Sequence, residues 1–380
     1  MGTDFLQSEL SHILIFQAIV LVIILSNAWL MRACRHEPPA DLPRVSILVP
    51  ARNEEGNIRA CIRSLLAQDY PNFEVIALDD QSSDATPAIL QELKAEYPNM
   101  KLVTGVPSPD PRIVGKNWAC AQLARRASSD LLLFTDADTQ HHPNTLRVLA
   151  SALAGEQADL LTGFPRQHMR TWGERLLVPF FGWASLCFTP LWLAYRLRMP
   201  VLANAVGQML LFRREAYQAV GGHAALGASI VDDLELAQRI KAAGLRWRLI
   251  NASDLIACRM YSGGREAYEG FSKNYFAAFG FRLLPYLFIF GWLLFMFWLP
   301  LLTLVAATEP PAVAFTCIGL SLLVWLVPYA QLRIPPALAL LYPVTILANT
   351  VVALRSLWLS LTGGIIWKDR PFARQRWRWL

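Results

Sequence analysis

The sequence predicts an α/β domain with a Rossmann-like, mostly parallel sheet, flanked by transmembrane α-helices toward the N-terminus and the C-terminus. Apolar residues make up 54% of the 380 residues and charged residues only 17%, whereas soluble proteins carry about 25% charged residues. The longest uncharged runs lie near the two ends of the chain. Between them, short strand patterns alternate with helical patterns, as in domains built on parallel sheets.

The first uncharged run, Ile13 to Met31, is long enough to cross a bilayer. Arg32 and Arg35 follow it, whereas the titratable residues before it are acidic or histidine. A secretory signal peptide has the reverse charge order, so we expect residues 1–35 to be a retained anchor. The positive-inside rule places the N-terminus outside and the following domain in the cytoplasm. Residues 36–43, with three prolines, are expected to form a linker.

From Arg44 onward, strands and helices alternate. Three short apolar runs are predicted strands, and each is rich in the β-branched or large apolar residues of a buried parallel strand. The predicted strands are 45–50, 73–80 and 131–138, and the predicted helices between them are 53–68 and 83–97. Two of the strands end in carboxylates. Ligands bind at the carboxyl ends of parallel strands, so these acidic clusters should converge on one site.

Leu176 to Tyr195 is also uncharged and apolar, although Pro179 and Pro190 interrupt it. If this run crossed the membrane, the acidic motifs before and after it would lie on opposite sides. We therefore expect an interfacial helix pair at about 174–199, inside a cytoplasmic domain of residues 36–280. A buried core helix is the alternative.

Residues 281–380 contain three more uncharged runs of spanning length, 283–308, 310–332 and 334–354. Three crossings would place the basic tail outside, against the positive-inside rule. We therefore expect two crossings, with the third run re-entrant or in the interface and the tail in the cytoplasm. The basic residues of the tail are Lys368, Arg370, Arg374, Arg376 and Arg378.

Charge and cysteine content exclude other classes of protein. The net charge is +6, but the basic residues cluster beside apolar runs, which indicates membrane anchoring and no nucleic-acid partner. The six cysteines are scattered without a CxxC pair. Neither a zinc site nor a disulfide framework is therefore indicated, and free thiols fit a cytoplasmic domain.

The first candidate site is Asp79-Asp80, at the end of the second strand. Carboxylates there can accept hydrogen bonds from the base and ribose of a nucleotide. The alternative is a turn in which Ser83 or Asp84 caps the next helix, and both roles can hold together.

The second candidate is the pair Asp136 and Asp138. Carboxylates two residues apart after a strand can hold Mg²⁺ or Mn²⁺ against a diphosphate. A chain of this size contains about one DxD by chance, so the placement after an apolar strand carries the prediction. His141 and His142 follow; we expect them in a solvated loop, with a place near the metal as the alternative.

The third candidate is Asp232-Asp233, before a helical pattern. One of these carboxylates could act as a general base on a hydroxyl group, and the alternative is a helix cap favoured by the helix dipole. Lys116 follows a glycine and could pair with phosphate, although the P-loop pattern is absent.

Together these motifs resemble the family 2 glycosyltransferases of the GT-A fold. The resemblance covers about residues 44–275. Its motifs are the opening strand and nucleotide loop (45–55), the base-binding segment (78–84), the metal-binding DxD (135–139), the acceptor-side strand and helix (204–222) and the catalytic acidic motif (232–236).

The resemblance implies a role for each of these residues. Asp233 is expected to be the catalytic base, with Asp232 beside it, and Asp138 with Asp136 is expected to hold Mg²⁺ or Mn²⁺. Lys273 and Gln208 are expected to contact phosphate or the acceptor. The expected nucleotide-binding residues are Pro50, Arg52, Asn53, Glu54, Asp79, Asp80, Lys116 and Asp136.

Two departures from the family pattern bear on the acceptor. Asp232 replaces the usual glutamate, and the QxxRW motif is missing. At its expected place stands the segment 268–274, where Lys273 could supply the cation and Asn274 occupies the place of the tryptophan. This departure weakens the interpretation as a polysaccharide synthase.

The closest likeness is to the membrane-anchored branch that glycosylates ceramide, hopanoids or carotenoids. It implies inverting transfer from a nucleotide-diphosphate sugar, expected to be a UDP-sugar, to a lipid acceptor at the cytoplasmic face of the cell membrane. The alternatives are a processive polysaccharide synthase and a catalytically idle membrane scaffold.

Overall fold

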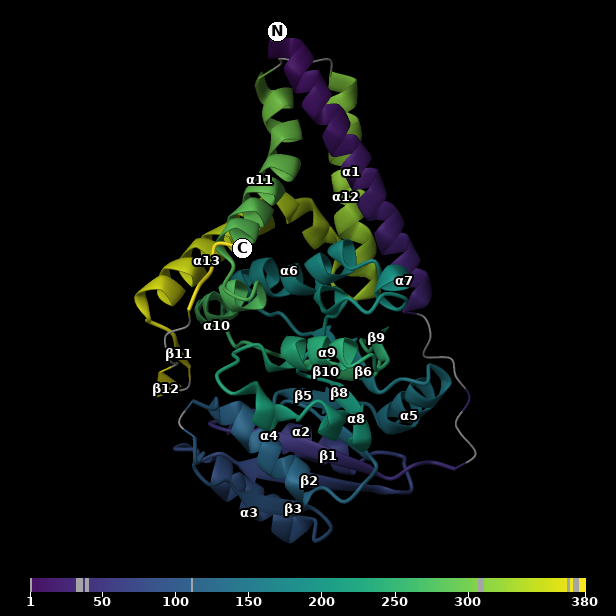
Figure 1. Ribbon diagram of the computed structural model, residues 1–380, viewed down its shortest axis with the longest axis vertical. Coiled ribbons are helices and arrows are strands. Elements are labelled where there is room, and N and C mark those ends of the chain that lie inside the picture. The colour runs from purple at the N-terminus through teal and green to yellow at the C-terminus, as the bar shows by residue number, and fades with distance from the viewer. Residues whose placement is uncertain are drawn as a thin grey trace.

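The computed structural model describes residues 2–31, 37, 41–110, 112–306, 311–367, 370–371 and 376–380. A sheet domain forms one end of the molecule, and long helices form the other, with the N-terminus at the far tip (Figure 1). Residues 36 and 38–40 of the predicted linker, and Lys368 and Arg374 of the predicted tail, lie outside the described residues.

The central sheet has seven strands in the order β3-β2-β1-β4-β8-β6-β9. Only β8 runs antiparallel to its neighbours in this sheet. The strands are β1 (Val45–Ala51), β2 (Phe73–Asp79), β3 (Lys101–Thr104), β4 (Leu131–Phe134), β6 (Leu160–Phe164), β8 (Leu210–Arg213) and β9 (Trp247–Asn251). The predicted mostly parallel sheet is therefore confirmed, and β1, β2 and β4 end at the same edge.

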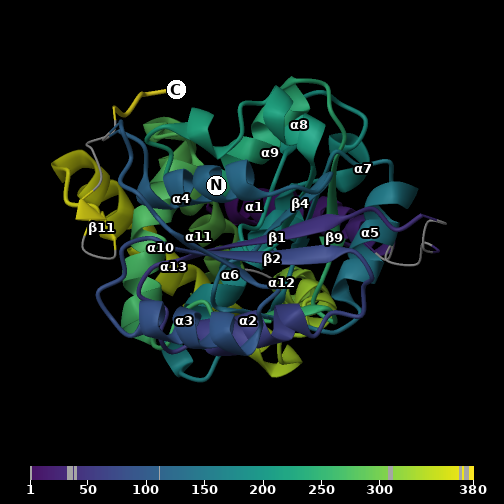
Figure 2. The ribbon, with the colours of Figure 1, turned by 90° about the horizontal axis from the view of Figure 1, so that it is seen from below.

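Helices cover both faces of this sheet, with α2 and α3 on one face and α4, α8 and α9 on the other (Figure 2). Because strand side chains alternate, Ile47 and Val49 pack into the core with α2 and α3, whereas Leu48 faces the core with α4 and α9. The helices are α2 (Ile58–Leu66), α3 (Thr86–Glu96), α4 (Gly115–Arg126), α5 (Thr145–Gly155), α8 (Arg214–Ala219) and α9 (Asp232–Ala242).

Three predicted boundaries are wrong by a few residues. Helix α2 begins at Ile58 and not at Asn53, and α3 begins at Thr86 and not at Ser83. The residues before each helix instead form loops that hydrogen-bond to one another. Strand β4 ends at Phe134, so the DxD motif occupies the turn before β5 (Thr139–His141).

A second sheet supports this turn. Its central strand, β10 (Ile256–Cys258), pairs with β5 on one side and with β7 (Arg166–Gln167) on the other. It therefore brings the residues around Cys258 against the DxD turn.

At the other end of the molecule, α1 (Gly2–Leu30), α11 (Leu283–Ala306) and α12 (Pro311–Gln331) extend together away from the sheet domain (Figure 1). Helix α13 (Tyr342–Thr362) follows the short η3 turn (Pro336–Leu341) and lies lower and obliquely, beside α10 (Gly264–Ala278). By length and composition, four helical stretches in the described residues could cross a membrane, one near the N-terminus and three near the C-terminus. The apolar helices at both ends are thus confirmed, and the number that cross stays a prediction.

The polar residues of α13 point toward the protein. The Asn349 side chain is fully buried; its Oδ1 accepts a hydrogen bond from the Tyr275 hydroxyl (2.5 Å), and its Nδ2 donates to the Leu176 carbonyl (3.1 Å). The Arg355 guanidinium lies 4.5 Å from the centroid of the Tyr268 ring. These contacts tie α13 to α10 and α6.

The apolar run around residues 176–195 forms α6 (Trp172–Phe188) and the short α7 (Leu191–Ala194). Thr171 and Glu174 form a capping box that starts α6. Trp183 is fully buried and stacks on Trp325 of α12, with ring centroids 4.0 Å apart. The predicted helix pair therefore exists and joins the sheet domain to the long helices; its depth in a membrane stays a prediction.

One buried amide joins α1 to this segment. Asn27 Nδ2 donates to the carbonyls of Leu186 and Thr189 (2.8 Å each), and its Oδ1 accepts from the Leu191 N–H (3.0 Å). Helix ends leave such backbone groups without partners, so Asn27 caps the end of α6 and the start of α7 together.

Candidate active site

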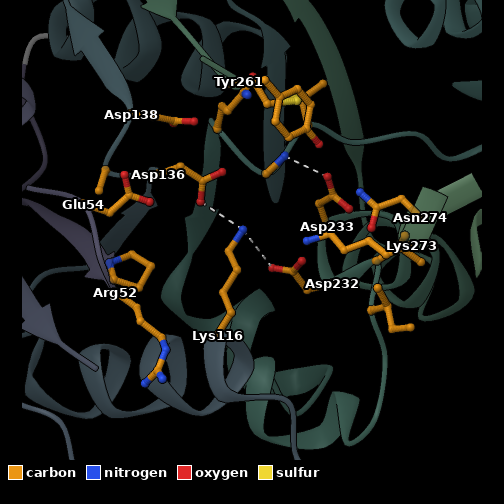
Figure 3. Close-up of a pocket in the computed structure, with 18 of the residues that line it drawn as sticks. Arg52, Glu54, Lys116, Asp136, Asp138, Asp232, Asp233, Tyr261, Lys273 and Asn274 are labelled. Atoms are coloured by element: carbon orange, nitrogen blue, oxygen red, sulfur yellow. Dashed lines mark hydrogen bonds and ion pairs between the residues drawn. The ribbon is translucent and has the colours of Figure 1, made fainter. Parts of the chain in front are cut away.

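A cavity of about 950 Å³ lies at the carboxyl ends of β1, β2 and β4. It is lined by the loops after β1 and β2, the DxD turn, the starts of α4 and α9, and side chains of α6 and α10. Figure 3 shows the acidic and basic side chains that face one another across it. Both strand-end acidic clusters therefore converge on one site, as the topology predicts.

The loops after β1 and β2 hold each other through hydrogen bonds. Arg52 Nη1 donates to the Asp80 carbonyl (2.8 Å), and the Asn53 N–H donates to Ser82 Oγ (3.0 Å). Asn53 and Gln81 adopt φ angles of 51° and 58°, a region that costs non-glycine residues about 1–3 kcal/mol and is concentrated at functional sites. Both residues line the cavity.

The two carboxylates that end β2 differ in placement. Asp80 is buried and lines the cavity. Asp79 Oδ1 instead accepts a hydrogen bond from the Ser82 N–H (3.3 Å), and Asp79 is not among the lining residues. Asp84 accepts from the Thr86 N–H (2.9 Å) at the start of α3, which is the capping role expected for that turn. The predicted nucleotide-binding residues that line the cavity are Pro50, Arg52, Asn53, Glu54, Asp80, Lys116 and Asp136.

The DxD turn presents Asp136 and Asp138 to the cavity. Among the residues that the structure describes, buried Asp138 Oδ1 has no hydrogen-bond partner, although the carboxylate pairs with the Cys258 thiol. Burial, together with repulsion from Asp136 and Glu54, raises the pKa of Asp138 to about 7. A divalent cation would supply the missing positive partner, so this carboxylate suits a metal. Among the described residues no three His, Cys, Asp or Glu side chains form a metal cluster, so a metal here would need further ligands from a bound molecule.

Lys116 lies in the first turn of α4 and links two acidic motifs. Its Nζ is 2.9 Å from Asp136 Oδ1 and 3.6 Å from Asp232 Oδ2 (Figure 3). Burial alone would lower its pKa, but the two carboxylates outweigh burial and raise the pKa well above its usual range. Lys116 is therefore a fixed positive charge at the centre of the site.

Asp232 and Asp233 begin α9 and differ in protonation. Burial opposes ionisation of Asp232, but Lys116 above all lowers its pKa below the usual value. Burial and the neighbouring Asp232 raise the pKa of Asp233 to about 7. The Asp233 oxygens accept hydrogen bonds from the N–H groups of Gly207 (2.8 Å) and Leu234 (2.7 Å). Asp233 is thus held rigidly, with a pKa suited to a general base.

Behind Asp232 lies His223, which the sequence patterns did not single out. Its Nε2 is 3.8 Å from Asp232 Oδ2, and its Nδ1 is 3.0 Å from the Tyr217 hydroxyl oxygen. Burial lowers the pKa of His223 to about 4, so the ring is neutral near pH 7 and supports Asp232 by position.

The remaining predicted contacts, Gln208 and Lys273, also line the cavity, as does Asn274, which stands in the place of the family's tryptophan. Gln208 Oε1 accepts from Gln167 Nε2 (2.9 Å). The charge of Lys273 also lowers the pKa of Asp232. Lys273 thus acts electrostatically on the acidic start of α9, in line with the predicted cationic role.

The expectation of a solvated loop is wrong for His141. Its ring is buried, with Nε2 3.0 Å from Thr135 Oγ1 and 3.1 Å from Thr139 Oγ1. Burial lowers its pKa to about 3. His141 therefore braces the DxD turn from behind, whereas His142 is exposed.

Sequence reasoning also missed Tyr261 and Gln167, which line the cavity. Tyr261 packs against Gly270, where an added Cβ would lie 2.3 Å from the tyrosine hydroxyl oxygen. A glycine within α10, where helix propensity disfavours it, was the available signal for this close approach.

Comparisons with known proteins agree with this geometry. Residues 46–221 match the family described as glycosyl transferase family 2. The chain is 28% identical over 218 residues to a probable glycosyltransferase, YdaM, from Bacillus subtilis, an alignment that covers 56% of this chain and 50% of that protein. It is 24% identical over 238 residues to 4,4'-diaponeurosporenoate glycosyltransferase from Staphylococcus haemolyticus, covering 60% of each. The chain thus spans about half the length of these relatives.

A shorter match, 39% identical over 111 residues, joins the chain to beta-monoglucosyldiacylglycerol synthase from Trichormus variabilis, covering 29% of this chain and 23% of that enzyme. Among solved structures, a mannosyltransferase from Pyrobaculum calidifontis, determined with GDP-Man and Mn²⁺, superposes with a TM-score of 0.51 at 19% identity and covers 92% of this chain and 99% of that one. The fold expected from the motifs is confirmed. These matches support a family 2 glycosyltransferase domain over residues 46–221, on a fold of the GT-A type that is flanked by long apolar helices.

Proposed function

We propose that the protein is an inverting glycosyltransferase that moves a sugar from a nucleotide-diphosphate donor, a UDP-sugar, to a hydroxyl group of a lipid. One observation carries this proposal. A single cavity joins the nucleotide-type loops, the DxD turn and Asp233 to apolar side chains of α6.

The donor occupies the end of the cavity beneath the loops after β1 and β2. Asp80 and Asn53 accept hydrogen bonds from the base and ribose, as carboxylate and amide oxygens can. Lys116 neutralises phosphate oxygens, because it is the fixed positive charge beside Asp136.

Asp138, with Asp136, would hold Mg²⁺ or Mn²⁺ against the diphosphate. A cation held there would supply positive charge against the negative charge of the leaving nucleoside diphosphate. The unpartnered Asp138 Oδ1 supports this assignment, as does the Mn²⁺ in the structurally similar mannosyltransferase.

Asp233 accepts the proton of the acceptor hydroxyl. The acceptor oxygen forms a bond to the anomeric carbon while the bond from that carbon to the phosphate oxygen breaks, and the nucleoside diphosphate leaves. A single displacement of this kind inverts the anomeric configuration. The N–H groups of Gly207 and Leu234, which donate to Asp233, fix the orientation of its carboxylate.

The lipid acceptor reaches the site at the cytoplasmic face of the cell membrane. The relatives named for diaponeurosporenoate and diacylglycerol products support a lipid acceptor. Inward crossing by α1, outward by α11 and inward by α12 keeps the catalytic domain and Arg376 and Arg378 in the cytoplasm. In this arrangement α13 lies in the interface, as its oblique position beside α10 suggests (Figure 1).

The test is transfer of radiolabel from a panel of UDP- and GDP-sugars into an organic-extractable product, with purified protein, total membrane lipid and Mn²⁺ or Mg²⁺. We expect one sugar per lipid from a UDP-sugar. Asp233→Asn should reduce transfer about 100- to 10,000-fold while nucleotide binding persists. Wild-type transfer by that variant would refute the assignment of the base. A ladder of products would identify a polymer synthase, and absence of both transfer and nucleotide-sugar binding would favour an idle scaffold.

A further inference from the structure

The cavity extends beyond the charged residues into an apolar slot. Its walls are Phe164 at the end of β6, Val178 and Gly182 of α6, and Leu332 and Ile334 just after α12; all five line the same cavity as Asp233. None of these side chains can hydrogen-bond, and none serves the nucleotide or the proton transfer. An apolar wall continuous with a polar reaction centre is typical of a site for an amphipathic ligand.

Polar contacts fix the position of the slot wall that contains Leu332. Asn251 Nδ2 donates to the Gln331 carbonyl (2.6 Å), and Arg333 makes a two-pronged ion pair with Asp254 (3.1 and 3.0 Å). Arg333 also adopts a φ of 58°. The chain leaving α12 is thus fixed to the sheet domain on both sides of Leu332.

Gly182 lets Leu332 pack directly on α6, and this contact forms one wall of the slot. An added Cβ at this position would lie 2.8 Å from Leu332 Cδ1 and 3.9 Å from Phe164 Cδ1. Helix propensity disfavours glycine in the middle of α6, so local structure does not account for it. A larger residue at position 182 would either place its own side chain in the slot or push Leu332 into it.

The slot has an apolar margin. Phe181, on the next residue of α6, lines the cavity and is 37% exposed. Helix α6 lies across the molecule at the foot of α1 and α12 (Figure 1), the helices that we propose cross the bilayer. A hydrocarbon chain could therefore pass from the membrane along Phe181 without crossing water.

We infer that this slot binds the hydrocarbon chain of the acceptor, with the hydroxyl end at Asp233 and the chain lying along the wall where Leu332 packs on Gly182. The inference rests on the proposed function and adds to it: the acceptor is an alcohol with a slender chain near its hydroxyl, and Gly182 selects for chain width.

Photolabelling tests the slot without requiring transfer. The probe is hexadecanol with a mid-chain diazirine, in nanodiscs that contain the full-length protein, and labelled peptides are located by mass spectrometry. We expect label on the α6 peptide and on the peptide that contains Leu332. Gly182→Leu should reduce this label about tenfold or more, because it overfills a fitted site.

Two further variants separate the slot from misfolding. Gly319→Leu is the matched control, because it also replaces a helical glycine but has nothing within 4 Å of an added Cβ; it should label like the wild type. The double variant Gly182→Leu/Leu332→Ala restores space and should regain label. UDP affinity reports folding throughout, and Gly182→Ala, with a smaller intrusion, replaces Gly182→Leu if that variant fails to bind UDP.

Label confined to α1, α11 and α12, and equal in wild type and Gly182→Leu, would overturn the slot. A different result would refute the proposed function. In that case the slot is labelled in the expected pattern, but no nucleotide sugar supports transfer. Transfer with Asp233-dependent activity but without slot labelling would refute only the slot.

Discussion

The cavity has a proposed donor end beneath the loops after β1 and β2 and a proposed acceptor end beside α6 and residues 332–334. These two ends are assembled in different ways. The donor end consists of strand-end loops that bond to each other over about thirty residues of sequence, as Asn53 does with Ser82. The acceptor end depends on single buried amides that join segments much further apart, such as Asn27 with Leu186 and Asn349 with Leu176. The donor end is therefore built from neighbouring loops on one sheet, whereas the acceptor end is built from contacts between segments far apart in sequence.

This contrast predicts that changes at the donor end alter catalysis with little effect on stability. Asp138→Ala should have the largest effect, lowering kcat/KM about 100- to 1,000-fold, because the proposed cation loses its ligand. EDTA should lower wild-type transfer by about the same factor as Asp138→Ala does. Added Mn²⁺ should then restore transfer in the wild type but not in Asp138→Ala. An active Asp138→Ala variant with unchanged metal dependence would show that the cation binds elsewhere. The melting temperature of Asp138→Ala should change little, because the carboxylate makes a side-chain hydrogen bond with the Cys258 thiol while burial disfavours its charged form.

Lys116→Met should have the next largest effect. A charged hydrogen bond contributes about 1.5–3 kcal/mol, so we expect donor affinity, measured by calorimetry with UDP, to fall about 10- to 100-fold. Removal of the charge also leaves Asp136 and Asp232 facing each other. Unchanged UDP affinity would limit Lys116 to a structural role. The control is Lys94→Met, on α3 outside the cavity, which loses only hydrogen bonds to the Pro98 and Met100 carbonyls.

The proton-transfer step should depend on pH. Asp233 must be ionised to accept a proton, so kcat/KM should fall about tenfold per pH unit below its pKa of about 7. Asp232→Asn removes a like charge and should lower that pKa, so the variant keeps its own maximal rate to lower pH. A profile whose inflection does not move would exclude coupling between the two carboxylates. Glu92→Gln, on exposed α3, should leave the inflection unchanged.

Changes near the acceptor end should instead reduce stability with little effect on donor binding. Asn27→Leu leaves three backbone groups without partners and should reduce the free energy of unfolding by about 1–3 kcal/mol, measured by thermal denaturation in detergent. UDP affinity should not change. The control is Ser11→Leu on the same helix, which loses only a bond within α1. A loss of UDP affinity in Asn27→Leu would show that the two ends are coupled.

The same contrast determines how much the sequence could reveal. The strand patterns and the acids that follow them predicted the sheet and the converging loops, because parallel strands bring their carboxyl ends to one edge. The acidic pair at the start of α9 was predicted from its own motif, and its catalytic role stays a prediction. The exact neighbours were not predictable: Asp79 bonds within its own loop, and His141 is buried against Thr135. Both outcomes depend on side-chain direction, which periodicity does not encode. The apolar slot was missed because residues about 150 apart in sequence form it.

The fixed position of Leu332 has a consequence for biosynthesis. Proteins emerge from the ribosome N-terminus first, and domains fold in that order. A nascent chain that has reached α10 already has its nucleotide loops, its DxD turn and Asp233, but it lacks the wall supplied by residues 332–334. In the proposed function, the ability to bind an acceptor therefore arises only after α11 and α12 have been made, so that an unfinished chain would bind the donor before it could bind the acceptor.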